Sequence, residues 1–305
     1  MSKLVVILGP TASGKTSLAT NLAYHFQGEI ISADSRQIYK GMDIGTGKDL
    51  NEYVFKNKNI PYHLIDILKP SENYSVYTFK NDFSNIYDSL IDRKSLPILC
   101  GGTGLYIESI LLNYQMVNIP PDDDFRGKLE KQTLNNLIIE IQKTGKNIYD
   151  SEFHITKRRI IRSLEIHKYK NDKDVKNDID CNHIKPLVFG IDIERENILK
   201  KIKIRLENRL NDGMIDEVKE LIDSGLTLER LKYFGLEYKF VGEYLFDHIS
   251  FSEMKEKLNF AINRFSKKQM TFFRRMEKRG IKIHWVKLSE IKLINNKINT
   301  YLNEL

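Results

Sequence analysis

Residues 9–16 read GPTASGKT and match the phosphate-loop pattern G-x-x-x-x-G-K-[S/T] in full. Glycines in such a loop let backbone N–H groups converge on phosphate oxygens, and the N-terminus of the following helix adds its dipole. Lys15 would reach the terminal phosphates, and the Thr16 hydroxyl could hold a phosphate-bound Mg²⁺. The residues expected to bind phosphate are Gly9, Thr11, Ala12, Ser13, Gly14, Lys15 and Thr16. The motif leaves open whether the ligand belongs to a kinase, an NTPase or a transferase with a diphosphate leaving group.

Two acidic residues could act beside this loop. Asp34 follows the second apolar run, and the carboxyl ends of parallel strands meet at the crevice where a phosphate loop lies. Its carboxylate could accept a proton from an attacking nucleophile or hold a metal through water, or it could cap the next helix. Asp66 could be a Walker-B-like metal ligand, or it could be a buried acid that makes hydrogen bonds or a residue at the end of a strand.

Short apolar runs predict the strands that must position these residues. Helical stretches separate most of them, and this alternation predicts an α/β fold, a P-loop NTPase-like parallel sheet flanked by helices. The candidate strands are residues 4–8, 29–32, 63–67, 96–100, 186–191 and 282–286.

The region 115–180 has a different character. It is polar, rich in Asn and Lys, and helical in its periodicity, so we expect a small helical insert domain between core segments 1–114 and 181–305. Residues 170–178 carry charges of both signs and predict a solvated loop.

The composition of the chain excludes few classes of protein. The chain has 305 residues and a formal net charge of +7, which suggests a polyanionic partner, although lysine-rich surfaces also serve solubility. Its two cysteines, Cys100 and Cys181, have no metal-binding spacing and fit a reducing, cytoplasmic setting. No apolar run approaches the roughly 18 residues of a membrane span, so no membrane association is expected.

Residues 31–48, ISADSRQIYKGMDIGTGK, are far more specific than a phosphate loop. Together with the phosphate loop, this run closely resembles the tRNA dimethylallyltransferase (tRNA isopentenyltransferase) family. Further matching segments are 101–106 (GGTGLY), 159–165 (RIIRSLE) and 269–274 (QMTFFR). The family moves a dimethylallyl group from its diphosphate to N6 of adenosine 37 in tRNA. The resemblance therefore implies that the loop holds the diphosphate of a prenyl donor.

The resemblance also implies roles for individual residues. Asp34 would hydrogen-bond the adenine amino group and accept its proton, with Thr103 near the target nucleotide and Lys15 stabilising the leaving group. Arg205 occupies the place of an arginine that contacts the diphosphate. From the residues alone, Thr103 could belong to a glycine-rich turn and Arg205 could be a solvent-facing helix arginine.

The implied partners are dimethylallyl diphosphate, Mg²⁺ and the anticodon stem-loop of tRNA, bound by a monomer. Because enzymes that act on a base commonly extrude it into a pocket, splayed-base and phosphate contacts are expected. The residues expected to contact tRNA are Asp34, Ser35, Arg36, Gln37, Thr103, Arg126, Arg158, Arg159, Arg162 and Gln269. Arg158, Arg159 and Arg162 could instead form an ordinary basic face paired with Glu165.

Some positions depart from the family pattern. Phe272-Phe273 stand where the family has a tryptophan and a second aromatic residue, and we expect both to be core residues. Leu236-Glu237 stand within the family's Gly-Tyr-Arg/Lys element, and the insert is short. Two other functions are compatible with the phosphate loop, a small-molecule or nucleotide kinase using ATP and an RNA-binding module that uses a nucleotide as a switch.

Overall fold

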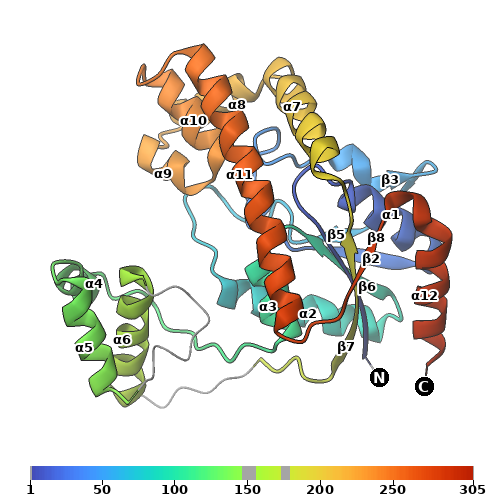
Figure 1. Cartoon of the computed structure of the whole chain (residues 1–305), viewed down its shortest axis with the longest axis horizontal. Coiled ribbons are helices and arrows are strands. Elements are labelled where there is room, and N and C mark those ends of the chain that lie inside the picture. Colours follow the sequence, from blue (N-terminus) through green and yellow to red (C-terminus); the bar gives the residue numbers. More distant parts are fainter. Residues whose placement is uncertain (1, 146–155, 173–178, 305) are drawn as a thin grey trace. The chain divides into compact units, whose positions relative to one another are not determined.

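The computed structural model describes residues 2–145, 156–172 and 179–304, and Figure 1 shows its elements. Its contacts divide the chain into two compact units. The core unit comprises Met1–Tyr114 and Asp180–Leu305, and the insert unit comprises Gln115–Ile179. Residues 170–172 of the predicted solvated loop belong to a helix, so the prediction was wrong there, and residues 173–178 lie outside the described residues.

The core unit is built on a six-stranded sheet in the order β5-β2-β6-β1-β7-β8, in which all neighbouring strands are parallel. This sheet confirms the predicted α/β class. The strands are β1 (Ser2–Leu8), β2 (Gly28–Ser32), β5 (Tyr62–His63), β6 (Leu96–Gly101), β7 (Ile184–Ile191) and β8 (Ile283–Val286).

The strand register places the carboxyl ends of the central strands at one edge. Leu8 of β1 pairs with Gly101 of β6, and Ser32 of β2 pairs with Cys100. The loops that follow β1, β2 and β6 therefore emerge together. These loops contain the phosphate loop, Asp34 and Thr103.

The prediction of a strand over residues 63–67 was wrong beyond its first residue. β5 ends at His63, and both Leu64 (φ 62°) and Asp66 (φ 56°) have left-handed backbone conformations. The segment instead pairs irregularly with the chain after Asp34, because Asp66 N donates to Gln37 O and Ile67 N donates to Ile38 O. A small hairpin of β3 (Val54–Phe55) and β4 (Lys58–Asn59) precedes it.

Helices cover both faces of the sheet (Figure 1). Val5 and Ile7 of β1 share an apolar cluster with Leu22 of α1 (Lys15–Phe26) and Ile294 of α12 (Ile291–Asn303), so these helices pack on one face. Alternation along β1 turns Leu4, Val6 and Leu8 to the other face. The helices α2 (Val76–Asp92) and α3 (Gly104–Leu111) contact β6 and contribute nothing to the first cluster, which assigns them to that face.

The C-terminal half of the core unit is mainly helical. Its longest helix, α11 (Phe251–Lys278), starts at a capping box of Ser250 and Glu253 and contacts α3, α7 and α10. It thereby carries Gln269 and Phe272 to the loop end of the sheet. The other helices of this part are α7 (Arg195–Asn211), α8 (Met214–Asp223), α9 (Leu228–Tyr233) and α10 (Leu236–Leu245), with 3-10 turns at Leu50–Tyr53 (η1) and Leu288–Glu290 (η2).

The insert unit has a small core of its own. Its helices are α4 (Asp123–Glu130), α5 (Leu134–Lys143) and α6 (Lys157–Asp172). Leu129, Leu137, Ile141, Ile160, Ile161 and Leu164 form a buried cluster among them. The apolar faces of these helices therefore pack against one another within the insert unit.

Candidate active site

A pocket of about 680 Å³ lies in the core unit at the carboxyl ends of β1, β2 and β6. Most of the predicted site residues of the core unit meet in its wall. Those that line it are Thr11, Ala12, Ser13, Gly14, Lys15, Thr16, Asp34, Ser35, Arg36, Gln37, Thr103, Arg205 and Gln269. Gly9 does not line the pocket; a Cβ there would lie 2.7 Å from Ser13 Oγ, so its role is to leave room for Ser13.

The phosphate loop has the backbone geometry of an anion cradle. Ala12 (φ 60°) and Gly14 (φ 84°) both have left-handed conformations, and α1 begins directly after them at Lys15. The first turn of a helix leaves its N–H groups without intrahelical partners. These donors and the positive end of the helix dipole therefore face the pocket, as binding of a phosphate requires.

Lys15 lies in the phosphate loop with its ammonium in a desolvated position. Burial lowers the pKa of Lys15, while the neighbouring Cys100 and Asp34 raise it. Its Nζ is 3.4 Å from Pro10 O, a weak contact for a cation. A poorly solvated ammonium ion with so little compensation attracts an anion strongly.

Asp34 and Thr103 are held together through the segment that follows β2. Asp34 Oδ1 accepts a hydrogen bond from Arg36 N (2.9 Å), and Thr103 Oγ1 accepts one from Ser35 N (3.0 Å). Residues 35–38 form a turn and no helix starts there, so the alternative that Asp34 caps a helix was wrong. The bond to Arg36 N fixes the orientation of the carboxylate in the pocket wall. Thr103 is the N-cap residue of α3, at the turn that follows β6. It therefore belongs to the glycine-rich turn and also lies beside the segment that carries Asp34.

Gln269 joins two of the pocket's loops. Its Oε1 accepts a hydrogen bond from Thr11 N (2.9 Å), and its Nε2 donates to Gly102 O (2.9 Å). The side chain is only 8% exposed. The amide is thus used to hold the phosphate loop against the loop after β6, and a contact of Gln269 with tRNA stays a prediction.

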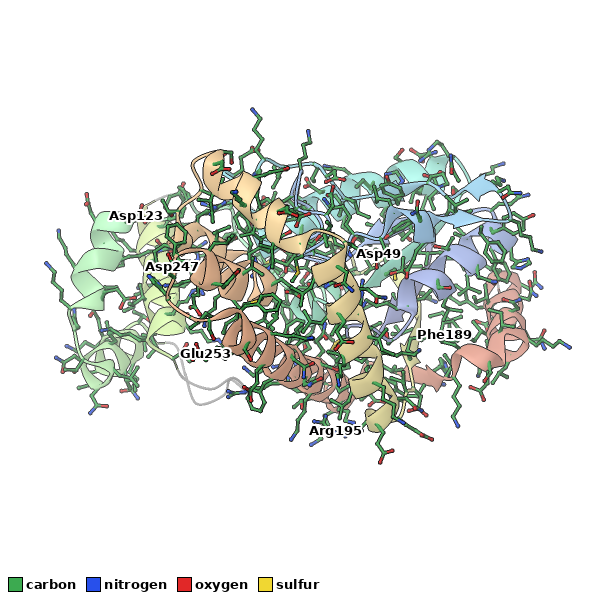
Figure 2. The ribbon with its side chains drawn as sticks, turned by 90° about the horizontal axis from the view of Figure 1, so that it is seen from above. Asp49, Asp123, Phe189, Arg195, Asp247 and Glu253 are labelled. Atoms are coloured by element: carbon green, nitrogen blue, oxygen red, sulfur yellow. The ribbon has the colours of Figure 1, made fainter. Side chains whose placement is uncertain are left out.

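Arg205 faces the pocket, and the alternative of a solvent-facing arginine was wrong. Its Nη2 donates to Gly47 O (3.2 Å) and to Asp49 Oδ2 (2.6 Å), and Asp49 is labelled beside α7 in Figure 2. Arg209 follows one helical turn later and also lines the pocket. The sequence reasoning missed Arg209, although the spacing i, i+4 places it on the same helix face as Arg205.

Two further pocket residues, Glu52 and Phe272, were missed or misjudged. Glu52 in η1 accepts a hydrogen bond from Thr16, and burial together with the nearby Asp49 raises its pKa. Phe272 lines the pocket, and the centre of its ring is 4.2 Å from the Arg275 guanidinium, so the expectation that Phe272 is a core residue was wrong. The same expectation is confirmed for Phe273, which is fully buried.

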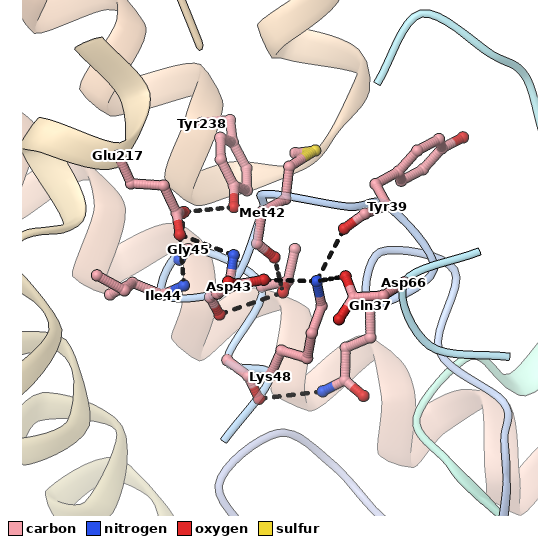
Figure 3. A network of polar contacts seen from close by, with 12 residues as sticks. Gln37, Tyr39, Met42, Asp43, Ile44, Gly45, Lys48, Asp66, Glu217 and Tyr238 are labelled. Carbon is pink, nitrogen blue, oxygen red and sulfur yellow. Dashed lines mark hydrogen bonds and ion pairs between the residues drawn. The ribbon is translucent and has the colours of Figure 1, made fainter. Parts of the chain in front are cut away.

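Asp66 lies outside the pocket wall and binds a lysine instead. Lys48 Nζ donates to Asp66 Oδ1, to Asp43 Oδ1 (2.6 Å) and to Tyr39 O (2.8 Å), as Figure 3 shows. The Walker-B-like alternative for Asp66 was therefore wrong, and the alternative of an acid that makes hydrogen bonds is confirmed. Within the described ranges, no group of three or more His, Cys, Asp or Glu side chains could hold a metal by itself.

The predicted arginines of the insert unit fall into two kinds. Arg126 binds Glu165 through Nε and Nη2 (both 2.8 Å), and Arg162 binds the same carboxylate. The alternative of a pairing with Glu165 is therefore confirmed for Arg162, whose contact with tRNA stays a prediction. Burial raises the pKa of Glu165, but the bonds from Arg126, Asp122 N and Arg162 outweigh it and hold that pKa below its ordinary value. Arg158 and Arg159 are exposed on α6.

The parallel sheet, the phosphate loop and the carboxylate after β2 define a phosphate-binding α/β protein of the P-loop class. Comparison with family models is more specific. A model described as IPP transferase matches residues 37–276, and a model described as isopentenyl transferase matches residues 2–63. The chain belongs to the IPP transferase family.

Individual relatives agree with this assignment. The chain is 46% identical to tRNA dimethylallyltransferase 1 of Azobacteroides pseudotrichonymphae, covering 97% of both proteins, and 44% identical to tRNA dimethylallyltransferase 1 of Syntrophus aciditrophicus, covering 98% of both. Among solved structures, the full-length tRNA isopentenylpyrophosphate transferase of Bacillus halodurans has a TM-score of 0.71 at 31% identity and covers 98% of this chain and 96% of its own. A eukaryotic dimethylallyltransferase acting on tRNA, with a TM-score of 0.67 at 22% identity and coverages of 89% and 70%, shares the fold. These relatives do not favour the kinase or nucleotide-switch alternatives.

None of the helices in the described part of the chain combines the length and apolar character needed to cross a membrane.

Proposed function

We propose that this chain transfers a dimethylallyl group from dimethylallyl diphosphate to N6 of adenosine 37 in tRNA. The observation that carries the proposal is the meeting of a complete phosphate loop and the Asp34 carboxylate in one pocket. The pocket thus offers an anion site for a leaving diphosphate and a proton acceptor for the attacking amine.

The proposed chemistry divides between these two sides. The bond between the donor's C1 and its diphosphate oxygen breaks, a bond from C1 to adenine N6 forms, and N6 gives one proton to Asp34. Lys15, Arg205 and the N–H groups at the start of α1 stabilise the negative charge that develops on the diphosphate. Thr103, bonded to Ser35 N, lines the side on which Asp34 lies.

The side-chain oxygens of Thr16 and Glu52 beside the phosphate loop are suitable ligands for Mg²⁺. Thr16 donates a hydrogen bond to Glu52, so a hydroxyl and a carboxylate lie together in the pocket wall. Mg²⁺ is usually held by one or two such protein oxygens together with substrate phosphates and water. Thr16 and Glu52 would hold the ion, which would neutralise part of the charge on the diphosphate.

We propose that the tRNA anticodon stem-loop supplies the acceptor base. Ser35, Arg36 and Gln37 follow Asp34 in the pocket wall and would contact the extruded nucleotide. Exposed Arg158 and Arg159 of the insert unit would meet phosphates, and Arg126 and Arg162 would do so while bound to Glu165. We further propose that the protein acts as a cytoplasmic monomer.

Label transfer tests the proposed function directly. The protein is incubated with unmodified tRNA and dimethylallyl diphosphate that is labelled in its prenyl group, in parallel with ATP alone. We expect label to enter adenosine. Turnover of ATP without labelling of the base would refute the transferase and support a kinase.

Asp34→Asn tests the role of the base with little structural change. The asparagine oxygen can still accept the hydrogen bond from Arg36 N, so the turn is preserved while the proton acceptor is lost. We expect the single-turnover rate to fall by about 10²–10⁴-fold, the usual contribution of a general base, with donor binding retained. A near-normal single-turnover rate in Asp34→Asn would show that Asp34 is not the base.

A further inference from the structure

Arg36 lines the pocket two residues after Asp34, and its side chain differs from that of its neighbour in having no polar partner. The amide of Gln37 is tied to the protein, because Nε2 donates to Gly47 O (3.0 Å). The backbone N–H of Arg36 donates to Asp34 Oδ1. Its guanidinium group, however, forms neither a hydrogen bond nor an ion pair with another residue in the described part of the chain. The N–H donors of this group are therefore available to an anion.

The guanidinium group of Arg36 lies over an aromatic ring. Its central carbon is 5.2 Å from the centre of the Tyr233 ring, which is within the range of a cation–π contact. A Cβ on Gly235, a residue with a φ of 123°, would lie 3.7 Å from Arg36 Nε, so the side chain also passes close to the backbone that follows α9. A guanidinium group in such a contact uses its face and keeps the N–H donors at its edge for a second partner.

Tyr233 is itself held by a second arginine. The guanidinium carbon of Arg230 lies 4.7 Å from the centre of the same ring. Arg230 has polar partners of its own in the loop before α2. Its Nε donates to Pro70 O (2.8 Å), and its Nη1 donates to Asn73 Oδ1 (2.7 Å). The Tyr233 ring thus connects an arginine that is fixed by hydrogen bonds to Arg36, which is not.

The position of Arg36 indicates which anion it could bind. Lys15 and the phosphate loop already supply donors for a diphosphate, whereas Arg36 lies on the turn that carries Asp34. A nucleotide that leaves its stack and enters a pocket brings the phosphates of its own backbone with it. Arginine contacts to such phosphates fix the register of a nucleic acid on a protein. Arg36 is therefore placed to hold the acceptor nucleotide on the side of the proton acceptor.

We propose that Tyr233 is a positioning residue for tRNA, because its ring holds the guanidinium group of Arg36 in place for a phosphate beside the acceptor adenosine. This inference rests on the proposed function, since it takes the anion to be a phosphate of tRNA. Tyr233 lies outside the pocket wall, so it acts through Arg36. Without the ring, the long Arg36 side chain would have to be ordered when tRNA binds, and this ordering costs affinity.

Two titrations test the proposal, one with a fluorescent, unmodified tRNA transcript followed by anisotropy and one with dimethylallyl diphosphate followed by calorimetry. We expect Tyr233→Leu to weaken tRNA binding by about 3- to 30-fold, the range that loss of a cation–π contact implies. The slope of log affinity against log salt concentration should fall by about 1, as for the loss of one phosphate contact. Binding of dimethylallyl diphosphate should not change. Tyr233→Phe keeps the ring and loses only the hydrogen bond to the Tyr39 hydroxyl, so it should retain the affinity for tRNA.

Two further variants distinguish positioning from a general loss of structure. Phe246→Leu is the matched control, because Phe246 is 40% exposed, as Tyr233 is, and also lies outside the pocket wall. It should bind tRNA as the unchanged protein does. Arg36→Gln should weaken tRNA binding at least as much as Tyr233→Leu. In the double variant, Tyr233→Leu should have no further effect, whereas independent losses would add. Additive losses would overturn the proposal.

The outcomes separate this inference from the proposed function. If the unchanged protein binds tRNA but puts no label into adenosine, the proposed function fails, and the binding titrations still decide the role of Tyr233. If it labels adenosine and a folded Tyr233→Leu variant binds tRNA equally well, only the role of Tyr233 is refuted. If the unchanged protein binds no tRNA, both are refuted.

Arg36→Lys decides if Tyr233→Leu does not fold. A lysine keeps the positive charge but lacks the planar face that lies over the ring. We therefore expect Arg36→Lys to weaken tRNA binding, and an unchanged affinity in this variant would overturn the role of the Tyr233 ring.

Discussion

Glu217 of α8 organises the loop that carries Gly45 and Gly47 to the pocket. Its Oε2 accepts hydrogen bonds from Asp43 N and Ile44 N (both 2.7 Å), and its Oε1 accepts from Gly45 N (2.9 Å) and from the Tyr238 hydroxyl (2.7 Å), as Figure 3 shows. Three successive backbone donors thus depend on one carboxylate.

Glu217→Gln should therefore be costly although it barely changes the shape of the side chain. An amide keeps one acceptor oxygen and turns an NH₂ group toward the remaining donors, so one or two backbone N–H groups lose their partner. A buried donor left unpaired costs about 1–3 kcal/mol, which gives an expected loss of about 1–6 kcal/mol in the free energy of unfolding. Displacement of Gly47 should also weaken diphosphate binding, because Arg205 donates to Gly47 O.

Urea unfolding of the variant, followed by titration with diphosphate, measures both effects. Tyr238→Phe is the matched control, since it removes one hydroxyl donor and leaves the three backbone donors paired, with an expected loss of about 1 kcal/mol. The reasoning would be refuted if Glu217→Gln and Tyr238→Phe had the same stability and the same affinity for diphosphate.

Three further substitutions test other contacts. Gln269→Leu should lower the free energy of unfolding by about 2–4 kcal/mol and weaken diphosphate binding, because it leaves Thr11 N and Gly102 O without their partner. Urea unfolding and calorimetry measure the two effects, and unchanged values would contradict the bridging role of Gln269. Gly47→Ala should cost about 1–3 kcal/mol, because it strains a positive φ and displaces Arg209; a wild-type melting curve would argue against this packing. Glu165 has a lowered folded pKa, so the stability it contributes is present above its unfolded pKa of about 4.3 and is lost as the pH falls through the lower folded value. In Glu165→Gln that part of the acid-induced loss should be absent, and unfolding curves measured from pH 7 to pH 2 would show an unchanged profile if Glu165 were not responsible.

The sequence was sufficient for features that depend on local pattern. The apolar runs at β1, β2, β6, β7 and β8 predicted strands because apolar side chains of each are buried, and the phosphate loop and Asp34 followed from motif and position. The segment after His63 was wrongly predicted as a strand because its residues are apolar and Leu64 and Ile65 are buried. Its backbone is not extended, since Leu64 and Asp66 have positive φ angles.

Contacts between distant segments were not predictable in the same way. Glu237 and Arg209 belong to different helices, and nothing in either local sequence indicates that they meet. Glu52 looks like an ordinary surface acid until η1 brings it to Thr16. Gln269 was recognised by its motif, but its two backbone partners come from the loops after β1 and β6.

The loops of the pocket are thus supported by side chains from the C-terminal helices. Gln269 of α11 bonds to the loops that contain Thr11 and Gly102, and Glu217 of α8 bonds to the loop that precedes Gly47. The strands bring these loops to one edge, but the loops themselves are irregular and need partners for their backbone groups. The phosphate loop at residues 9–16 is therefore held in its conformation partly by a side chain from a distant helix. The backbone groups of the pocket loops thus find their partners in residues more than a hundred positions later in the chain.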